Sequence, residues 1–79
     1  MNDQAKTILE ELRERYGKAT LSKREMANEL GVSMSTLDLY ISKGYGIPNY
    51  KKLGKAKNAK MVFSIVDVAK FLADTIKVA

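Results

Sequence analysis

The sequence of 79 residues contains neither cysteine nor histidine. Without cysteine it has no disulfide scaffold and no thiolate metal site. Without histidine it lacks the commonest general base and the commonest metal ligand. No apolar run approaches the length of about 20 residues that a membrane-spanning helix needs, and we expect no signal peptide at the start of the chain. We therefore expect a cytoplasmic protein that does not enter the membrane.

The sequence also lacks a recognisable catalytic constellation. Its nine acidic residues are scattered, and no nucleophile, glycine-rich phosphate loop or metal-ligand spacing accompanies them. We expect that the protein is not an enzyme and binds neither a cofactor nor a metal ion. A chain of this length is expected to form one domain, residues 1–79, with a modest core.

Positive charge is present and unevenly distributed. The net charge is +5, yet residues 1–17 carry three basic and four acidic side chains. Six lysines and no acidic residue lie between Lys43 and Lys60. Such a block beside a balanced segment indicates a polyanionic partner, although a lysine-rich loop that keeps the protein soluble explains it equally well.

An amphipathic helix is predicted over residues 3–16. Asn2 or Asp3 can cap its start, and Gly17 can end it. Its apolar side chains form one stripe, which either packs on the core of the domain or forms a contact between two copies. The stripe consists of Ala5, Ile8, Leu9, Leu12 and Tyr16.

The clearest helix signals lie in residues 20–44. Ser22 and Glu25 have the spacing of a capping box, in which each side chain binds the backbone amide of the other residue. This motif predicts a helix that runs to about Leu30 and stops at Gly31.

A second helix is predicted after a short turn. Ser33 caps it, it covers residues 34–43, and Gly44 closes it. Two short helices joined by a three- to four-residue turn that contains glycine form a helix-turn-helix. The small Ala27 lets the helices cross, and Leu37 fills the space between them. An ordinary αα-hairpin is the alternative, but it does not need this pattern.

A β-hairpin is predicted over residues 50–63. Residues 50–54 can form one strand, and the β-favouring run within residues 59–64 can form its partner. The polar, basic link between them gives the hairpin a cationic tip, so we interpret the hairpin as a wing. The last helix is predicted over residues 65–78. Its apolar stripe consists of Ile65, Val68, Ala69, Leu72 and Ile76.

Two groups of residues carry a resemblance to a known family. In the helix pair they are Leu21–Ala27, Leu30–Ser33, Thr36, Leu37, Tyr40, Lys43 and Gly44. In the hairpin and last helix they are Ile47, Pro48, Tyr50–Lys55, Phe63, Asp67, Val68, Phe71 and Leu72. With these residues the chain resembles the small MerR-like helix-turn-helix domains of the excisionase and AlpA type. It departs from them in its N-terminal helix and at Val66, where family members often have serine.

The resemblance implies a winged helix-turn-helix fold, mainly α-helical with a small β-hairpin wing, preceded here by the additional N-terminal helix. It also implies a DNA-binding protein, either a transcriptional regulator or an excisionase-like recombination directionality factor of a phage or mobile element. The expected partner is double-stranded DNA, and an integrase or RNA polymerase is a candidate second partner. We also expect self-association through the N-terminal helix, mainly on DNA.

The second helix of the motif is the candidate recognition helix in the major groove. Ser35 can bond several base edges, and Met34 can contact a thymine methyl group. Asp38 can accept a hydrogen bond from cytosine N4, but phosphates would repel it. No arginine or asparagine lies on this face, so we expect modest intrinsic specificity. The predicted base-facing residues are Ser33, Met34, Ser35, Asp38 and Ser42.

Phosphate contacts are expected at the start of the first motif helix, at the end of the second and on the wing. Lysine there is a mobile point charge suited to phosphate. The predicted phosphate contacts are Lys23, Arg24, Lys43, Lys55, Lys57 and Lys60. Tyr45 and Tyr50 either contact DNA or pack within the protein.

Two other kinds of binding protein remain as alternatives. The chain can be a protein–protein interaction module that keeps the fold without DNA binding, with the N-terminal helix as its docking surface. RNA binding is disfavoured because no paired aromatic residues on neighbouring strands are available to stack bases.

Overall fold

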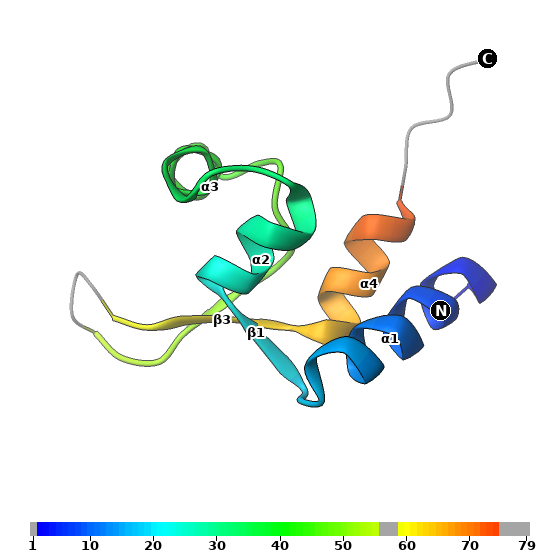
Figure 1. Ribbon diagram of the computed structural model, residues 1–79. Coiled ribbons are helices and arrows are strands. Elements are labelled where there is room, and N and C mark those ends of the chain that lie inside the picture. The colour runs from blue at the N-terminus through cyan, green and yellow to red at the C-terminus, as the bar shows by residue number, and fades with distance from the viewer. Residues whose placement is uncertain (1, 56–58, 75–79) are drawn as a thin grey trace, which may run out of the picture.

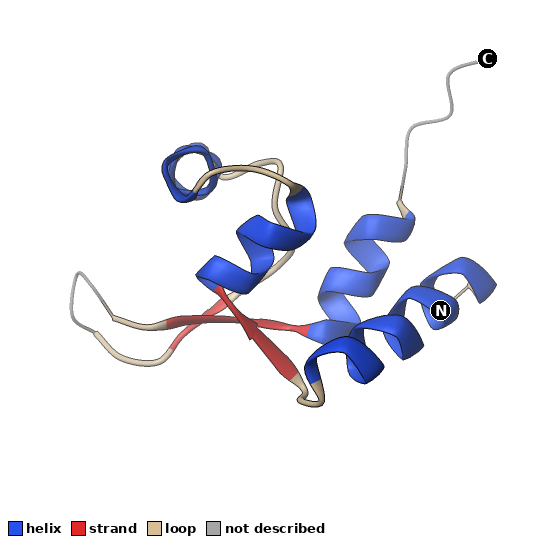
Figure 2. Cartoon of the chain, viewed as in Figure 1, coloured by secondary structure: helices blue, strands red, loops and turns tan. Residues whose placement is uncertain are grey.

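The computed structural model describes residues 2–55 and 59–74, which form four helices and a three-stranded antiparallel sheet (Figure 1). The elements in chain order are α1 (Asp3–Tyr16), β1 (Thr20–Ser22), α2 (Lys23–Leu30), α3 (Met34–Lys43), β2 (Lys51–Lys52), β3 (Met61–Ser64) and α4 (Ile65–Ala73). The strands lie in the order β1–β3–β2. Figure 2 shows α2 and α3 near one end of the sheet and the α1–α4 pair near the other.

Polar side chains begin the first three helices at the positions that the sequence predicts. Asn2 Oδ1 accepts a hydrogen bond from the Ala5 amide at 2.7 Å. The capping box of α2 is complete, since Ser22 Oγ accepts from the Glu25 amide at 3.2 Å and Glu25 Oε1 accepts from the Ser22 amide at 2.9 Å. Ser33 caps α3 through the amide three residues later, at 3.1 Å. The predicted bounds of these helices are confirmed.

The sequence predicts no strand at Thr20–Ser22, yet β1 pairs with β3 along its whole length. Leu21 lies opposite Phe63, and Ser22 lies opposite Val62. Three residues are too few to show the alternation that identifies a strand. The predicted hairpin is therefore part of a larger sheet, whose middle strand is β3.

The β2–β3 hairpin is present, but β2 covers only two residues and β3 only four, fewer than predicted. Lys52 lies opposite Met61, and the Leu53 amide donates to the Lys60 carbonyl at 2.8 Å. Gly54 then follows in a bend, and glycine weakens a strand because it has no side chain to pack. The strands therefore stop short of the predicted bounds.

The helix α4 begins directly after β3 and ends at Ala73 rather than at the predicted Val78. Asp74 leaves the helical conformation, with φ −86° and ψ 71°. A negative charge is unfavourable at the C-terminal end of a helix dipole, and aspartate has a low helix propensity. Ile76, the last residue of the predicted stripe, lies outside the described residues.

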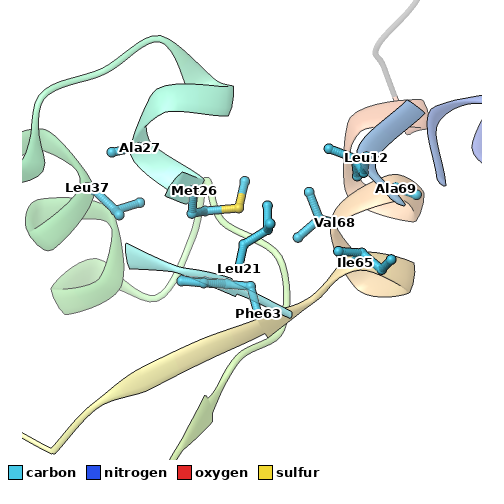
Figure 3. Close-up of a cluster of buried hydrophobic side chains, with 9 residues drawn as sticks. All are labelled: Leu12, Leu21, Met26, Ala27, Leu37, Phe63, Ile65, Val68 and Ala69. Atoms are coloured by element: carbon cyan, nitrogen blue, oxygen red, sulfur yellow. The ribbon is translucent and has the colours of Figure 1, made fainter. Parts of the chain in front are cut away.

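One cluster of buried side chains joins the helices to the sheet (Figure 3). Its members are Leu12, Leu21, Met26, Ala27, Leu37, Phe63, Ile65, Val68 and Ala69. In the apolar stripe of α1, Ala5 and Leu12 are buried, whereas Ile8 and Leu9 are half-buried. The stripe therefore packs on the core. None of the described helices is long and apolar enough to cross a membrane.

Glu29 links α1 to α2 through polar contacts. Arg15 Nη1 lies 2.7 Å and 2.8 Å from the two carboxylate oxygens of Glu29, and the Tyr16 hydroxyl donates to the same carboxylate. The side chain of Glu29 is only 10% exposed. Burial and the hydrogen bond to Glu29 raise the pKa of Tyr16. The end of α1 is thus held against α2.

Candidate functional site

The turn between α2 and α3 fixes how these helices meet. Gly31 has φ 71°, a left-handed conformation that favours glycine, and its amide reaches back to carbonyls at the end of α2. The Val32 amide donates to the Ala27 carbonyl at 3.0 Å. Ala27 and Leu37 are both buried and belong to the core cluster. Ala27, Gly31 and Leu37 therefore occupy the places in the helix-turn-helix that their spacing predicts.

One side of α3 is open to solvent. All five predicted base-facing residues are exposed, while Leu37 is buried and Tyr40 and Ile41 are half-buried. The predicted helical phase of α3 is therefore confirmed. Leu39 also lies on the open side, with 49% exposure. The predicted site omits Leu39. The helical phase of α3 alone could have identified it, because Leu39 follows Asp38 around the helix by about 100°.

A basic groove lies beside the open side of α3. It has a volume of about 610 Å³, and its walls come from the first turn of α2, from α3 and from the β2–β3 hairpin. We call it the basic groove. The charged residues that line it are Lys23, Arg24, Lys52, Lys60 and Asp38. The fold thus gathers two cations from α2 and two from the β2–β3 hairpin into one concave surface, to which α3 contributes a single carboxylate.

Lys23 and Asp38 form an ion pair across the groove. Lys23 is the first residue of α2, and Asp38 lies in the middle of α3. The side chains are 31% and 55% exposed, respectively. Lys23, a predicted phosphate contact, and Asp38, a predicted base contact, therefore pair with each other in the free protein.

Lys52 is a groove residue that the predicted site omits. It belongs to the lysine block, but a strand of two residues gives no alternation that tells which way its side chain points. The pairing of Lys52 with Met61 places both on the same face of the sheet. Both residues also line the groove.

Other predicted contacts lie away from the groove. Lys43, at the end of α3, does not line it, and its Nζ lies 5.9 Å from the centre of the exposed Tyr45 ring. Lys55 is exposed beyond β2. Lys57 lies outside the described residues. Tyr50 is 41% exposed, although its ring lies 5.9 Å from that of the buried Phe63.

No three carboxylates among residues 2–55 and 59–74 come together in a way that could hold a metal ion. Comparison of the chain with models of known families, with curated proteins and with solved structures finds no match.

Proposed function

We propose that this chain is a double-stranded DNA-binding protein of the MerR-like winged helix-turn-helix type. In this proposal α3 is the recognition helix in the major groove, and the β2–β3 hairpin is a wing on the phosphate backbone. The observation that carries the proposal is the basic groove, which opens beside the exposed side of α3. Cations that flank an exposed helix are the arrangement that positions such a helix over DNA.

The placement of two groove cations supports binding rather than stability as their role. Lys23 and Arg24 are the first two residues of α2. The positive end of the helix dipole favours acidic side chains there and disfavours cations by a few tenths of a kcal/mol or more. Arg24 is also exposed. An external anion would give Arg24 a favourable partner at that helix end and could replace Asp38 as the partner of Lys23. The amide groups there can also bind phosphate.

The dimensions of α3 fit the major groove. An α-helix with its side chains is about 10–12 Å in diameter, and the B-DNA major groove, about 12 Å wide, admits one such helix. Ser33, Met34 and Ser35 stand at the N-terminal end of α3, which is the part of a recognition helix that contacts base edges.

The sequence resemblance extends this proposal to a biological role. The protein would act as a transcriptional regulator or as an excisionase-like recombination directionality factor of a phage or mobile element. An integrase or RNA polymerase would then be a protein partner, and self-association would occur mainly on DNA. The alternative is a protein–protein interaction module that keeps the fold without DNA binding, for which the exposed Leu39 and Tyr45 would be candidate contacts.

A salt titration of DNA binding separates these two functions. Binding of the full chain to a fluorescent random duplex is measured between 50 and 200 mM salt. Each phosphate that is neutralised contributes about 0.9 to the slope of log affinity against log salt. Arg24→Ala should reduce this slope by about 0.9, whereas Glu10→Ala, an exposed change on α1, should not reduce it. Absence of binding at tens of micromolar protein would favour the interaction module.

A further inference from the structure

We propose that Asp38 sets the DNA selectivity of the basic groove by exchanging its partner. In the free protein its carboxylate neutralises Lys23. On a suitable target, Lys23 moves to a phosphate and Asp38 accepts a hydrogen bond from the N4 amino group of a cytosine. This inference rests on the proposed function, and it adds the exchange of ion-pair partners by which Asp38 would favour DNA with a cytosine at this position over other DNA.

The position of the ion pair is the first support. Asp38 is the only acidic residue that lines the described part of the groove, and it is paired with the cation at the first position of α2. A cation at that position is disfavoured by the helix dipole, so an anionic partner is favourable for Lys23. Asp38 supplies one in the free protein, and a DNA phosphate would supply another.

The exposure of the pair makes the exchange easy. The side chains of Lys23 and Asp38 are 31% and 55% exposed, so water screens their attraction. An ion pair of this kind contributes little to stability and breaks without disturbing the core. The cost of exchange instead falls on Asp38, because a carboxylate that has lost its cation beside the phosphate backbone is repelled unless it finds a hydrogen-bond donor.

The chemistry of the major groove names that donor. Cytosine presents an N4 amino group, whereas guanine presents the two acceptors N7 and O6, and thymine presents the acceptor O4. Adenine has an amino group, but its neighbouring N7 acceptor repels a carboxylate. Asp38 lies on the open side of α3 with Met34 and Ser35. A cytosine within reach of α3 would therefore satisfy Asp38, and other bases would leave it unpaired.

The variant Asp38→Asn tests the exchange because it keeps the shape of the side chain and removes its charge. Freed Lys23 should bind one more phosphate on random duplex. The salt slope should then steepen by about 0.9, which corresponds to about eightfold tighter binding at 0.1 M salt. Selection from a pool of random duplexes should change one preferred cytosine to adenine, because asparagine pairs with adenine N6 and N7.

Two further variants serve as controls. Lys52→Ala removes a groove cation that has no ion-pair partner among the described residues. It should flatten the slope by about 0.9 and leave the base preference unchanged. In a Lys23→Met background, Asp38→Asn should no longer steepen the slope, because no lysine is left to be released. Circular dichroism melts check that each variant folds.

The possible results separate the inference from the function on which it rests. A steeper slope on random DNA together with the change from cytosine to adenine supports the inference. If both proteins bind DNA tightly and Asp38→Asn has the same salt slope and base preference as the unchanged protein, the inference is overturned. The proposed DNA-binding function then remains in place. A steeper slope without a change of base overturns the base-reading role of Asp38. Failure of the unchanged protein to bind any duplex overturns both the inference and the proposed function.

Discussion

Replacing Leu37 with alanine should destabilise the domain severely. Leu37 is fully buried and is the one residue of α3 in the core cluster, where it lies near Ala27 of α2 (Figure 3). Truncation of a buried leucine costs about 2–5 kcal/mol, because apolar surface is lost and a cavity remains. At about 0.05–0.15 kcal/mol per residue, a chain of this size has a free energy of unfolding of roughly 4–12 kcal/mol. The substitution therefore removes a large part of the free energy of unfolding.

Leu39→Ala is the matched control, since it makes the same chemical change on the same helix. Leu39 is 49% exposed, so its truncation should change the free energy of unfolding by less than about 0.5 kcal/mol. Urea unfolding followed by circular dichroism gives both values. If Leu39→Ala destabilised the protein as much as Leu37→Ala, the orientation of α3 on α2 would be wrong, and the assignment of its exposed residues to a binding site would be wrong with it.

Three further predictions concern pH, the α1–α2 contact and the wing. Lys18, 2.8 Å away, and the backbone amide of Ser22 lower the pKa of Glu25, so Glu25 stabilises the folded state at pH values above its pKa in the unfolded chain. That stability should disappear as the pH falls through the lower folded pKa, and urea titrations of Glu25→Gln should show a smaller loss over the same range. Tyr16→Phe removes the hydroxyl that binds Glu29 and should lower the free energy of unfolding by about 1–3 kcal/mol; an unchanged melting curve would show that this contact is not formed. Replacing Lys55, Lys57 and Lys60 together with alanine should flatten the salt slope of DNA binding by up to about 2.7. Equal weakening on random and selected duplexes is expected, and loss on the selected duplex alone would mean that the wing reads bases.

Local chemistry explains which elements could be predicted from the sequence. A helix start depends on a capping side chain and an amide two or three residues away, so Asn2, Ser22 and Ser33 mark their helices correctly. A helix end at a left-handed glycine is equally local, as at Gly31 and Gly44. These signals place the helix pair and predict which side of α3 is exposed.

Features that depend on pairing between distant segments escaped prediction. The strand β1 exists because Leu21 finds Phe63 across the sheet, and nothing near Leu21 in the sequence records that pairing. The inclusion of Lys52 in the groove depends on its register with Met61. The Lys23–Asp38 ion pair depends on how α2 and α3 cross. The sequence therefore identified most of the charged groups of the site, while the fold determined which of them lie together.

Two helices start without any linking residue after a strand. Ser22 ends β1 and caps α2, and Ser64 ends β3 and caps α4. One inserted residue at either joint would turn the helix by about 100° relative to the strand and carry Met26 or Val68 out of the core. Another small residue with a side-chain oxygen should cap these helices as well, whereas an added or removed residue should displace the core side chains. We therefore expect chain length to be a stricter requirement than residue type at these joints.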